Sequence, residues 1–294
     1  MIPAEIIKKI KQVHIKSSRT VNTIMAGRYK SIFRGSGIEF EEVREYSPGD
    51  EVKSIDWKVS ARLGKPFIKL YKEERESIVM LLIDMSASQK FGTRSGLKLE
   101  KAAEIASVLA FSAIKNNDKA GAIFFTDKVE KYIPPKKGSA HVWRLIKEIF
   151  TFKPEGKSTD ICSALDFFAK VTKKNSLCFI ISDFLDKKNY IKNLKAARYK
   201  HEIIGIMLSD KGDFTLLNRG IVSLSDFETG RELIFDAGSA KTRRFYLKYK
   251  TKEYKQIIES LAKSKIDVLE IGTESSVADV LSKYFINKRV TSIR

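Results

Sequence analysis

Residues 77–92, SIVMLLIDMSASQKFG, end an apolar run with one carboxylate and two hydroxyls. Asp84, Ser86 and Ser88 stand at alternate positions, and in a loop this spacing lets all three side chains point toward one centre. A turn, a metal site, a nucleophile and a phosphate-binding loop are the four interpretations that compete. Asp and Ser favour turns, so these three residues alone do not decide between them.

Polar residues also cluster beside predicted elements at two later points of the chain. Ser158, Thr159 and Asp160 open a helical segment, and Ser182 and Asp183 follow the apolar run SLCFIIS. Open α/β sheets bind ligands at the carboxyl ends of their strands, so we expect all these groups on one rim. Carboxylates and hydroxyls without His or Cys form a hard donor set, which suits Mg²⁺, Mn²⁺ or Ca²⁺ and disfavours zinc.

The elements that position this rim are visible as regular alternation. Apolar runs predict strands, and apolar residues at helical spacing predict helices between them. The predicted strands are 78–84, 120–125, 129–134, 176–182, 202–208 and 266–271, and the predicted helices are 99–113, 140–150, one from about 158–160, 187–199, 240–264 and 275–286. This order predicts an α/β fold with a doubly wound, mostly parallel six-stranded sheet. Residues 129–134 follow their neighbour too closely for a helical crossover, so they should form an antiparallel edge strand.

Two further segments precede this domain, which we place at residues 77–290, and a third lies within it. Residues 1–34 form an N-terminal helical segment, and residues 35–76 alternate like a β segment around a Pro-Gly turn. The segment 219–236 resembles a β-hairpin, and we expect it to pack with 35–76 as a small β layer. Within 35–76 we expect a packing role for Tyr46, Asp50, Asp56 and Trp57, with a partner-binding edge as the alternative.

The composition bounds the class of protein. The chain of 294 residues carries a formal charge of +19, with its densest basic blocks at 186–200 and 241–255. The simpler interpretation is solvated helix faces, and the alternative is binding to nucleic acid, an anionic membrane surface or an acidic protein. There is no apolar window long enough for a membrane helix and no signal peptide, so we expect a cytoplasmic protein. Cys162 and Cys178 lack metal-type or redox-type spacing and should be buried free thiols.

The residues also resemble a known family. Asp-x-Ser-x-Ser after the first strand, a Thr before a later helix and an Asp after the next strand are similar to the metal-ion-dependent adhesion site of von Willebrand factor A domains. The upstream block GSGIEFEEVREYSPGDEVKSIDWKVSAR, followed by KEERESIVMLLIDMSAS, resembles domain of unknown function 58, the MoxR-associated bacterial and archaeal proteins with a von Willebrand factor A-like domain. The resemblance covers about residues 25–290.

This resemblance implies a function and a set of ligands. Asp84, Ser86, Ser88, Thr159 and Asp183 would hold Mg²⁺ (or Mn²⁺ or Ca²⁺), with Asp183 acting through water. The protein would be a non-enzymatic interaction module that binds an Asp or Glu of a partner and cooperates with a MoxR-type AAA+ ATPase. One departure is Gly156-Lys157-Ser158 before Thr159: Lys157 would weaken metal binding, and Ser158 would compete with Thr159 as ligand.

Other chemistries fit less well. The segment PEGKST lacks the first Gly of a phosphate-binding loop. A serine hydrolase needs a His base and a G-x-S-x-G turn, which the contexts of His14, His141 and His201 do not provide. An aspartyl-phosphate phosphatase would carry a second Asp where Ser86 stands. Asp160 also favours a purely structural helix cap, so that interpretation of 158–160 stays open.

Overall fold

The computed structural model describes residues 8–13, 16–17, 20–21, 39–72, 77–93, 96–218, 220–225 and 232–291. The chain divides into two compact units, one of Phe33–Ser77 and one of Met1–Ile32 with Ile78–Arg294. Each unit is described by itself. The predicted N-terminal helical segment falls mostly outside the described residues, and the parts of it that are described are helical.

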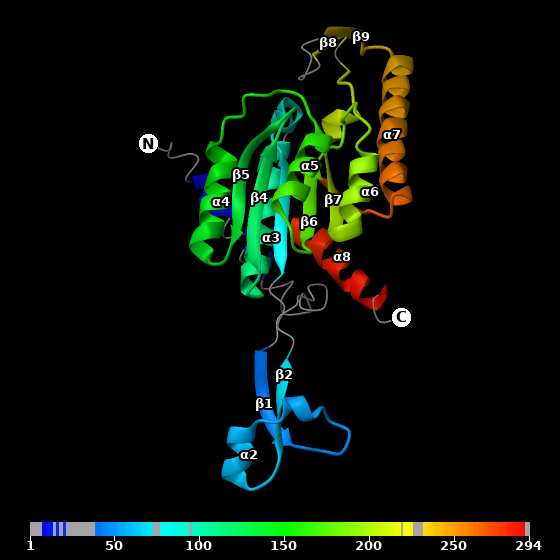
Figure 1. Cartoon of the computed structure of the whole chain (residues 1–294). Helices are drawn as coiled ribbons and strands as arrows, with labels where there is room; N and C mark the ends of the chain where they lie inside the picture. The colour runs from blue at the N-terminus through cyan, green and yellow to red at the C-terminus, as the bar shows by residue number, and fades with distance from the viewer. Residues whose placement is uncertain are drawn as a thin grey trace. The chain divides into compact units, whose positions relative to one another are not determined.

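The larger unit is built on one six-stranded sheet (Figure 1). Its strands are β3 (Ile78–Asp84), β4 (Lys119–Phe125), β5 (Val129–Lys136), β6 (Leu177–Ser182), β7 (Glu202–Ser209) and β10 (Asp267–Gly272), in the spatial order β10-β7-β6-β3-β4-β5. All neighbouring pairs are parallel except β4 and β5, which are antiparallel. This topology confirms the predicted fold class, including the antiparallel edge strand.

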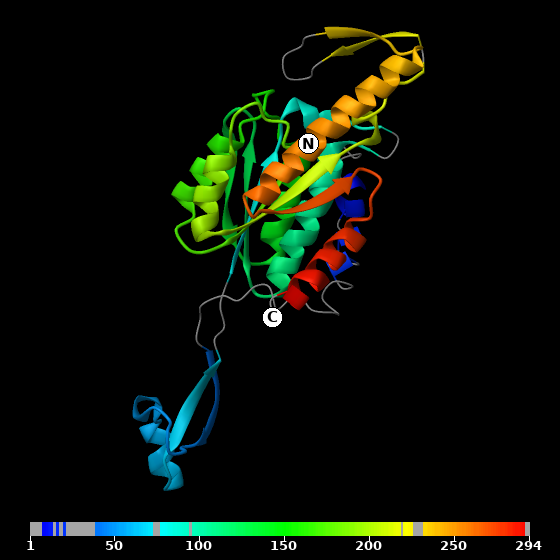
Figure 2. The same ribbon diagram turned by 90° about the vertical axis from the view of Figure 1, so that its right-hand side faces the viewer.

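Helices cover both faces of this sheet (Figure 2). The helices α3 (Lys98–Lys115) and α4 (Ser139–Thr151) pack together on one face, and α5 (Ile161–Val171) and α6 (Ile191–Lys200) pack together on the other. Beside α6 runs the long helix α7 (Ala240–Lys263), and α8 (Val277–Thr291) follows β10. The strands β3 and β6 are almost wholly buried because the two helical layers cover both faces, which explains their continuous apolar sequences.

A glycine permits close packing at the antiparallel edge. A Cβ added at Gly121 of β4 would lie 2.8 Å from the backbone nitrogen of Pro135 and 2.9 Å from the backbone oxygen of Ile133. Both are backbone atoms of β5, which a side chain could not push aside cheaply. Gly121 therefore lets β5 lie against β4 at this point of the ladder.

The smaller unit contains an antiparallel pair, β1 (Glu39–Glu45) and β2 (Phe67–Lys72), with a 3-10 turn (Val52–Ser54) and a helix, α2 (Trp57–Leu63), between them. The sequence pattern of residues 35–76 gave no indication of α2. Asp56 caps this helix by accepting hydrogen bonds from the backbone nitrogens of Lys58 and Val59. Asp50 accepts two hydrogen bonds from Arg44, at 2.6 and 2.9 Å, so the predicted structural roles of both aspartates are confirmed.

The predicted packing role of Trp57 is wrong. Trp57 is the first residue of α2 and 68% exposed, whereas the buried residue of that helix is Ser60, whose hydroxyl accepts from the backbone nitrogen of Phe67 at 2.8 Å. An isolated Trp between polar residues carries no helical periodicity, so its burial could not be judged from sequence.

We therefore expect Trp57→Ala to change the free energy of unfolding by less than about 0.5 kcal/mol, the usual range of exposed substitutions. A Trp in a core would cost about 3–5 kcal/mol when replaced by Ala. Urea denaturation of the full chain distinguishes these values. Ile68→Ala, at a site that is only 4% exposed in the same unit, is the matched control and should cost more.

The predicted hairpin 219–236 is present as β8 (Ile221–Ser225) and β9 (Glu232–Asp236), which form a two-stranded sheet of their own. Phe235 contacts Tyr246 of α7 edge-on, with ring centroids 5.9 Å apart. Arg243 donates to the backbone oxygens of Ala237 and Gly238 and so holds the hairpin against the start of α7. The packing of 35–76 with this hairpin stays a prediction.

Within the described ranges, none of the helices has the length and apolarity to cross a membrane. Cys178 is a buried free thiol, as predicted, and Cys162 is half-buried. Burial raises the pKa of both thiols above the ordinary range, so neither is activated as a thiolate.

Candidate metal site at the carboxyl end of the sheet

Asp84 ends β3 at the centre of the sheet and is completely buried. Its Oδ1 accepts from the backbone nitrogen of Ser86 at 2.9 Å, and its Oδ2 accepts from the hydroxyl of Ser182 at 2.6 Å. Burial, with the charge of Asp183 as the next cause, raises the pKa of Asp84 to about 7, and the hydrogen bonds from Ser182 and Ser86 oppose this rise. In the part of the chain that is described, no cation forms an ion pair with Asp84.

The two serines of the motif have adjacent hydroxyl groups. The hydroxyl oxygens of Ser86 and Ser88 lie 3.0 Å apart, with Ser86 buried and Ser88 half-buried. The amide nitrogen of Gln89 donates to the Ser88 hydroxyl at 3.3 Å. The amide oxygen of Gln89 is buried and has no hydrogen-bond partner among the described residues.

The loop that carries Thr159 is attached to the same edge. The backbone nitrogen of Ala87 donates to the oxygen of Lys157 at 2.8 Å, which joins the loop to the Ser86–Ser88 turn. Thr159 is 7% exposed, Ser158 is half-buried and the Lys157 side chain is exposed. Asp160 caps α5 by accepting from the backbone nitrogen of Ser163, so the structural interpretation of Asp160 is confirmed.

A glycine again permits the close approach of this loop. A Cβ on Gly156 would lie 1.9 Å from Oδ1 of Asp127 and 2.3 Å from the hydroxyl oxygen of Thr126. The backbone nitrogen of Gly156 donates to Glu130 at 2.8 Å. Gly156 therefore lets the Thr159 loop pack against the turn that follows β4.

Asp183 lies on the rim as predicted, but its carboxylate is already paired. It is 3% exposed, and its Oδ2 lies 3.3 Å from Nζ of Lys98 in the first turn of α3. The next residue, Phe184, is buried and has a φ of 58°, a left-handed conformation that is strained for a bulky side chain. The Ser182 hydroxyl accepts from the backbone nitrogen of Phe184 at 3.0 Å and helps to fix this turn.

The sequence pattern indicated neither the role of Lys98 nor the hydrogen bonds of Ser182. A Lys in the first turn of a helix is unfavourable to the helix dipole, and this was the one available signal for Lys98. Ser182 is the last residue of β6, and a serine at a strand end does not by itself indicate a buried hydrogen bond to Asp84. The cation near the rim was expected to be Lys157, whereas the buried cation is Lys98.

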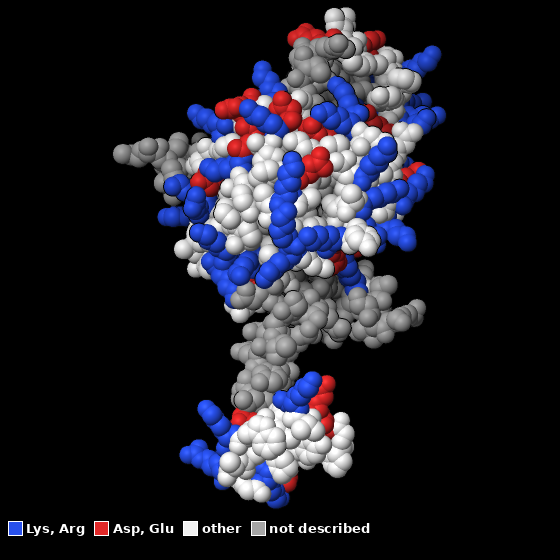
Figure 3. All heavy atoms as spheres, in the orientation of Figure 1, with Lys and Arg blue, Asp and Glu red and all other residues white. Residues whose placement is uncertain are grey.

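The donor set agrees with the chemistry of a hard cation. Asp84 is a buried carboxylate bound by neutral donors, and three hydroxyls from Ser86, Ser88 and Thr159 lie on loops attached to its strand. Acidic side chains gather along the upper rim of the larger unit (Figure 3). No group of three His, Cys, Asp or Glu residues with metal-binding geometry occurs among the described residues, so the hydroxyls would have to supply most ligands.

A family model places these features in context. The model described as protein of unknown function DUF58 matches residues 42–256, most of the chain. The chain belongs to the DUF58 family. This protein is 29% identical over 231 residues to the uncharacterized protein Rv1480 of Mycobacterium tuberculosis, covering 77% of this chain and 73% of that protein. It is also 27% identical over 107 residues to the uncharacterized protein YeaD of Bacillus subtilis, covering 36% and 25%.

Solved structures align with about three quarters of this DUF58 protein at low sequence identity. The conserved hypothetical protein BatB from Bacteroides thetaiotaomicron is 14% identical, with a TM-score of 0.49 and coverage of 73% of this chain and 99% of that chain. The VWA domain of SpRpn10 is 12% identical, with a TM-score of 0.37 and coverage of 72% and 95%. The von Willebrand factor A-like architecture of the larger unit rests on its own strand order.

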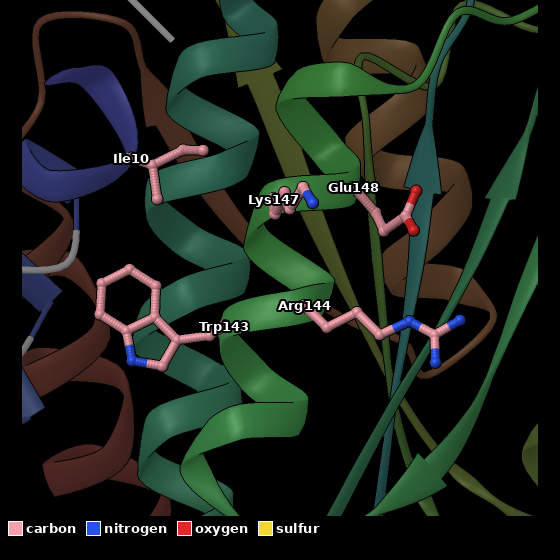
Figure 4. A pocket seen from close by; sticks show the side chains of 5 residues that line it. All are labelled: Ile10, Trp143, Arg144, Lys147 and Glu148. Atoms are coloured by element: carbon pink, nitrogen blue, oxygen red, sulfur yellow. The ribbon is translucent and has the colours of Figure 1, made fainter. Parts of the chain in front are cut away.

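A surface pocket of this DUF58 protein lies away from the rim. Its lining residues are Ile10 of the N-terminal helical segment and Trp143, Arg144, Lys147 and Glu148 of α4 (Figure 4). Trp143 also contacts Phe111 of α3 edge-on, with ring centroids 6.3 Å apart. None of the predicted ligands lines this pocket, so it plays no part in the candidate site.

We expect Ser182→Ala to destabilise this DUF58 protein by about 1–3 kcal/mol, because the buried nitrogen of Phe184 loses its acceptor and Asp84 loses a donor. The same change should raise the pKa of Asp84 further. Ser107→Ala is the matched control: Ser107 is also fully buried, but it donates only to Ala103 of its own helix. Equal unfolding free energies for the two variants would contradict the assigned role of Ser182.

Proposed function

We propose that this protein is a non-enzymatic, metal-dependent protein-interaction module. The cation Mg²⁺, Mn²⁺ or Ca²⁺ would be held by Asp84, Ser86, Ser88 and Thr159. Asp183 would contribute only indirectly, through water, because Lys98 already pairs with its carboxylate. When bound, the cation would offer positive charge and an open coordination position to an Asp or Glu of a protein partner. The fold by itself is compatible with many functions, so the proposal rests on the rim.

The observation that carries the proposal is the state of Asp84. A fully buried carboxylate whose described partners are hydroxyl and N–H groups is costly to ionise, and its burial raises the pKa of Asp84. Strongly perturbed groups that also have a geometric role mark functional sites. A divalent cation is the ligand that would relieve this cost, and the adjacent hydroxyls are oxygen donors of the type it accepts.

A protein partner is favoured over a substrate by the remaining groups near the rim. A hydrolase would need a proton acceptor beside the serines, and neither described imidazole is one. His141 is bonded to the backbone oxygen of Ala120. His201 lies at the start of β7, at the opposite end of the sheet from the rim, and is bonded to Ser176. The resemblance to MoxR-associated proteins suggests an AAA+ ATPase as co-worker in assembling or remodelling a client complex, in the cytoplasm.

The direct test is calorimetric titration of the full chain with MgCl₂ and MnCl₂, for the wild type and for Asp84→Asn. We expect binding to the wild type and none to the variant. Asp166→Asn, at an exposed carboxylate that accepts only from Asn193 among its recorded contacts, should bind like the wild type. Absence of binding to the wild type would refute the metal dependence.

The partner is tested by co-purification from native cells, with and without EDTA, and by identification of the captured proteins. Capture of an AAA+ ATPase that is lost both with EDTA and with Asp84→Ala is the expected result. Capture that survives both treatments would remove the rim from the interaction.

A second candidate function, binding to an anionic partner, is supported by one arrangement that sequence could not show. The two basic blocks fall on helices α6 and α7, and Arg198 of α6 donates to the backbone oxygen of Lys265, just after the end of α7, at 2.9 Å. Five of the eight basic residues of α7 form one exposed stripe at spacings of three and four, namely Lys241, Arg244, Lys248, Lys252 and Lys255. The helix α6 carries four basic and no acidic residues.

This second function makes an opposite prediction about the rim. Binding to DNA, RNA or anionic vesicles should weaken steeply with salt and should not respond to EDTA or to Asp84→Asn. The test variant combines Lys248→Glu with Lys252→Glu, which reverses two charges of the exposed stripe and should weaken binding. Lys173→Glu with Lys174→Glu, at exposed positions before β6, gives the same net charge and should bind more like the wild type. No binding to any of the three probes at low salt would exclude the candidate.

A further inference from the structure

Lys98 is a lysine in an unusual place. It is 2% exposed, although lysine side chains generally extend their ammonium groups to water. Its Nζ lies 3.3 Å from Oδ2 of Asp183 and 3.0 Å from Oδ2 of Asp213, and 5.8 Å from the ring centre of Phe91. Burial alone would lower the pKa of Lys98, but the two carboxylates outweigh burial and raise it, so the ammonium is charged.

The ammonium joins three segments at the rim. Asp183 follows β6, Lys98 begins α3, and Asp213 ends the short 3-10 turn η4 (Lys211–Asp213) after β7. The backbone nitrogen of Lys98 donates to the oxygen of Phe91 at 3.0 Å, which folds the loop after Ser88 back onto the helix. Lys98 therefore connects the predicted metal-binding loop with the turn that follows β7.

The turn η4 is itself fixed to the neighbouring loops. Asp210 and Asp213 form a reciprocal capping box, in which each side chain accepts from the backbone of the turn. Oδ2 of Asp210 accepts from the backbone nitrogen and the hydroxyl of Thr93 and from the hydroxyl of Thr273 at 2.5 Å. The position of Asp213 is thus determined independently of Lys98, and the lysine joins Asp183 to this fixed carboxylate.

We propose that Lys98 is a built-in cation that holds Asp183 and so maintains the rim without a bound metal. A divalent ion would then be held by Asp84 and the hydroxyls, while Asp183 is withheld from it by its ion pair. Lys98 lowers the affinity of the site for divalent cations and makes the fold of the rim independent of them. This inference concerns the same metal site as the proposed function. It rests on that function only where it refers to the affinity of the wild type for divalent cations.

The charges left unpaired in Lys98→Met predict how this variant behaves. The variant leaves Asp183 and Asp213 without their cation, beside the buried Asp84. Breaking a buried ion pair from one side is strongly destabilising because the remaining charge is unpaired. A divalent cation can replace the lost charge, so the variant should become a metal-dependent protein even though the wild type folds without metal.

The experiment compares thermal unfolding in EDTA and in MgCl₂, and measures Mn²⁺ affinity by calorimetry. We expect Lys98→Met to melt lower than the wild type in EDTA, to regain most of this loss with Mg²⁺, and to bind Mn²⁺ at least about tenfold more tightly, the size of effect typical of groups behind metal ligands. Lys98→Arg, which keeps the charge, should respond to Mg²⁺ like the wild type. A Lys98→Met variant with wild-type stability in EDTA, or with a wild-type response to Mg²⁺, would overturn the proposal.

Two charge-balanced double variants keep the test decisive if Lys98→Met does not fold. Lys98→Met with Asp213→Asn retains Asp183 without its cation and should bind Mn²⁺ more tightly than the wild type. Lys98→Met with Asp183→Asn carries the same net charge and should not. Equal affinities would show that Asp183 is not the group that Lys98 withholds.

The outcome for the proposed function is read separately. Mn²⁺ binding by Lys98→Met but not by the wild type would support the role of Lys98 and refute a metal-dependent wild-type function. Binding of Mn²⁺ by the wild type with no gain in Lys98→Met would support the metal-dependent function and refute the role of Lys98.

Discussion

Asp84→Asn is expected to stabilise the metal-free protein at pH 8 by about 2–4 kcal/mol, an unusual direction for a buried substitution. The reason is the raised pKa of Asp84, about 7 in the folded protein against 3.8 as its ordinary value. Because the folded state binds this proton more tightly, the contribution of Asp84 to stability is greatest below pH 4. It decreases as the pH rises and is fully lost above pH 7.

Asparagine can keep the local hydrogen bonds while removing the charge. Its oxygen can accept from the nitrogen of Ser86, and its amide can donate to the hydroxyl of Ser182, which has capacity to accept a second bond. Urea denaturation in EDTA at pH 4 and pH 8 measures the effect, with Asp166→Asn as control. A stabilisation of the same size at both pH values would show that Asp84 is not the titrating group.

His201→Asn is expected to have the opposite pH dependence. His201 is 4% exposed, its Nδ1 is bonded to the hydroxyl of Ser176 at 2.8 Å, and its ring lies 4.5 Å from that of Phe168. Burial, with the charge of Lys200 as the second cause, lowers the pKa of His201 to about 4 from 6.5. The neutral imidazole therefore supports the fold fully above pH 6.5, and this support is lost as the pH falls toward 4.

The shift corresponds to about 3 kcal/mol between pH 6.5 and pH 4. His201→Asn should be less stable than the wild type at pH 7, since the contact with Phe168 is lost, but should lose less stability on acidification. His141→Asn is the control for replacing a histidine, because His141 is half-buried and belongs to α4, which packs with α3 on the face of the sheet opposite α6. A variant that loses stability between pH 6.5 and pH 4 as the wild type does would remove His201 from the acid response.

Asp84 and His201 titrate over overlapping pH ranges with opposite signs. From pH 4 to pH 6.5, rising pH removes stability through Asp84 and adds stability through His201. Their contributions partly cancel in the wild type, so the single variants should show steeper and opposite slopes. The double variant Asp84→Asn with His201→Asn should be flatter than either, since distant sites are additive.

Local patterns predicted the strands and helices of the larger unit well. The apolar run before Asp84 predicted a strand buried on both faces, and the short spacing before Val129 predicted an antiparallel edge. These predictions succeeded because burial on both faces requires an uninterrupted apolar strand, and because a parallel crossover needs a dozen or more residues.

The same local patterns could not predict contacts between segments that are distant in the sequence. Nothing in the neighbours of Trp57 indicates its exposure. The prediction that Lys157 would be the cation at the rim relied on closeness in sequence to Thr159. The buried cation comes from the start of α3, 85 residues from Asp183 in the chain.

The sequence by itself determined the chemical types at the rim and the strand ends on which they stand: carboxylates and hydroxyls after β3 and β6, and a Thr before α5. Only the tertiary structure decided which of the two carboxylates is left without a cation. Asp183 meets Lys98 because α3 and η4 bring an ammonium and a second carboxylate to the same point, whereas Asp84 meets only neutral donors. Electrostatic pairing depends on distance in space, which hydrophobic periodicity does not encode.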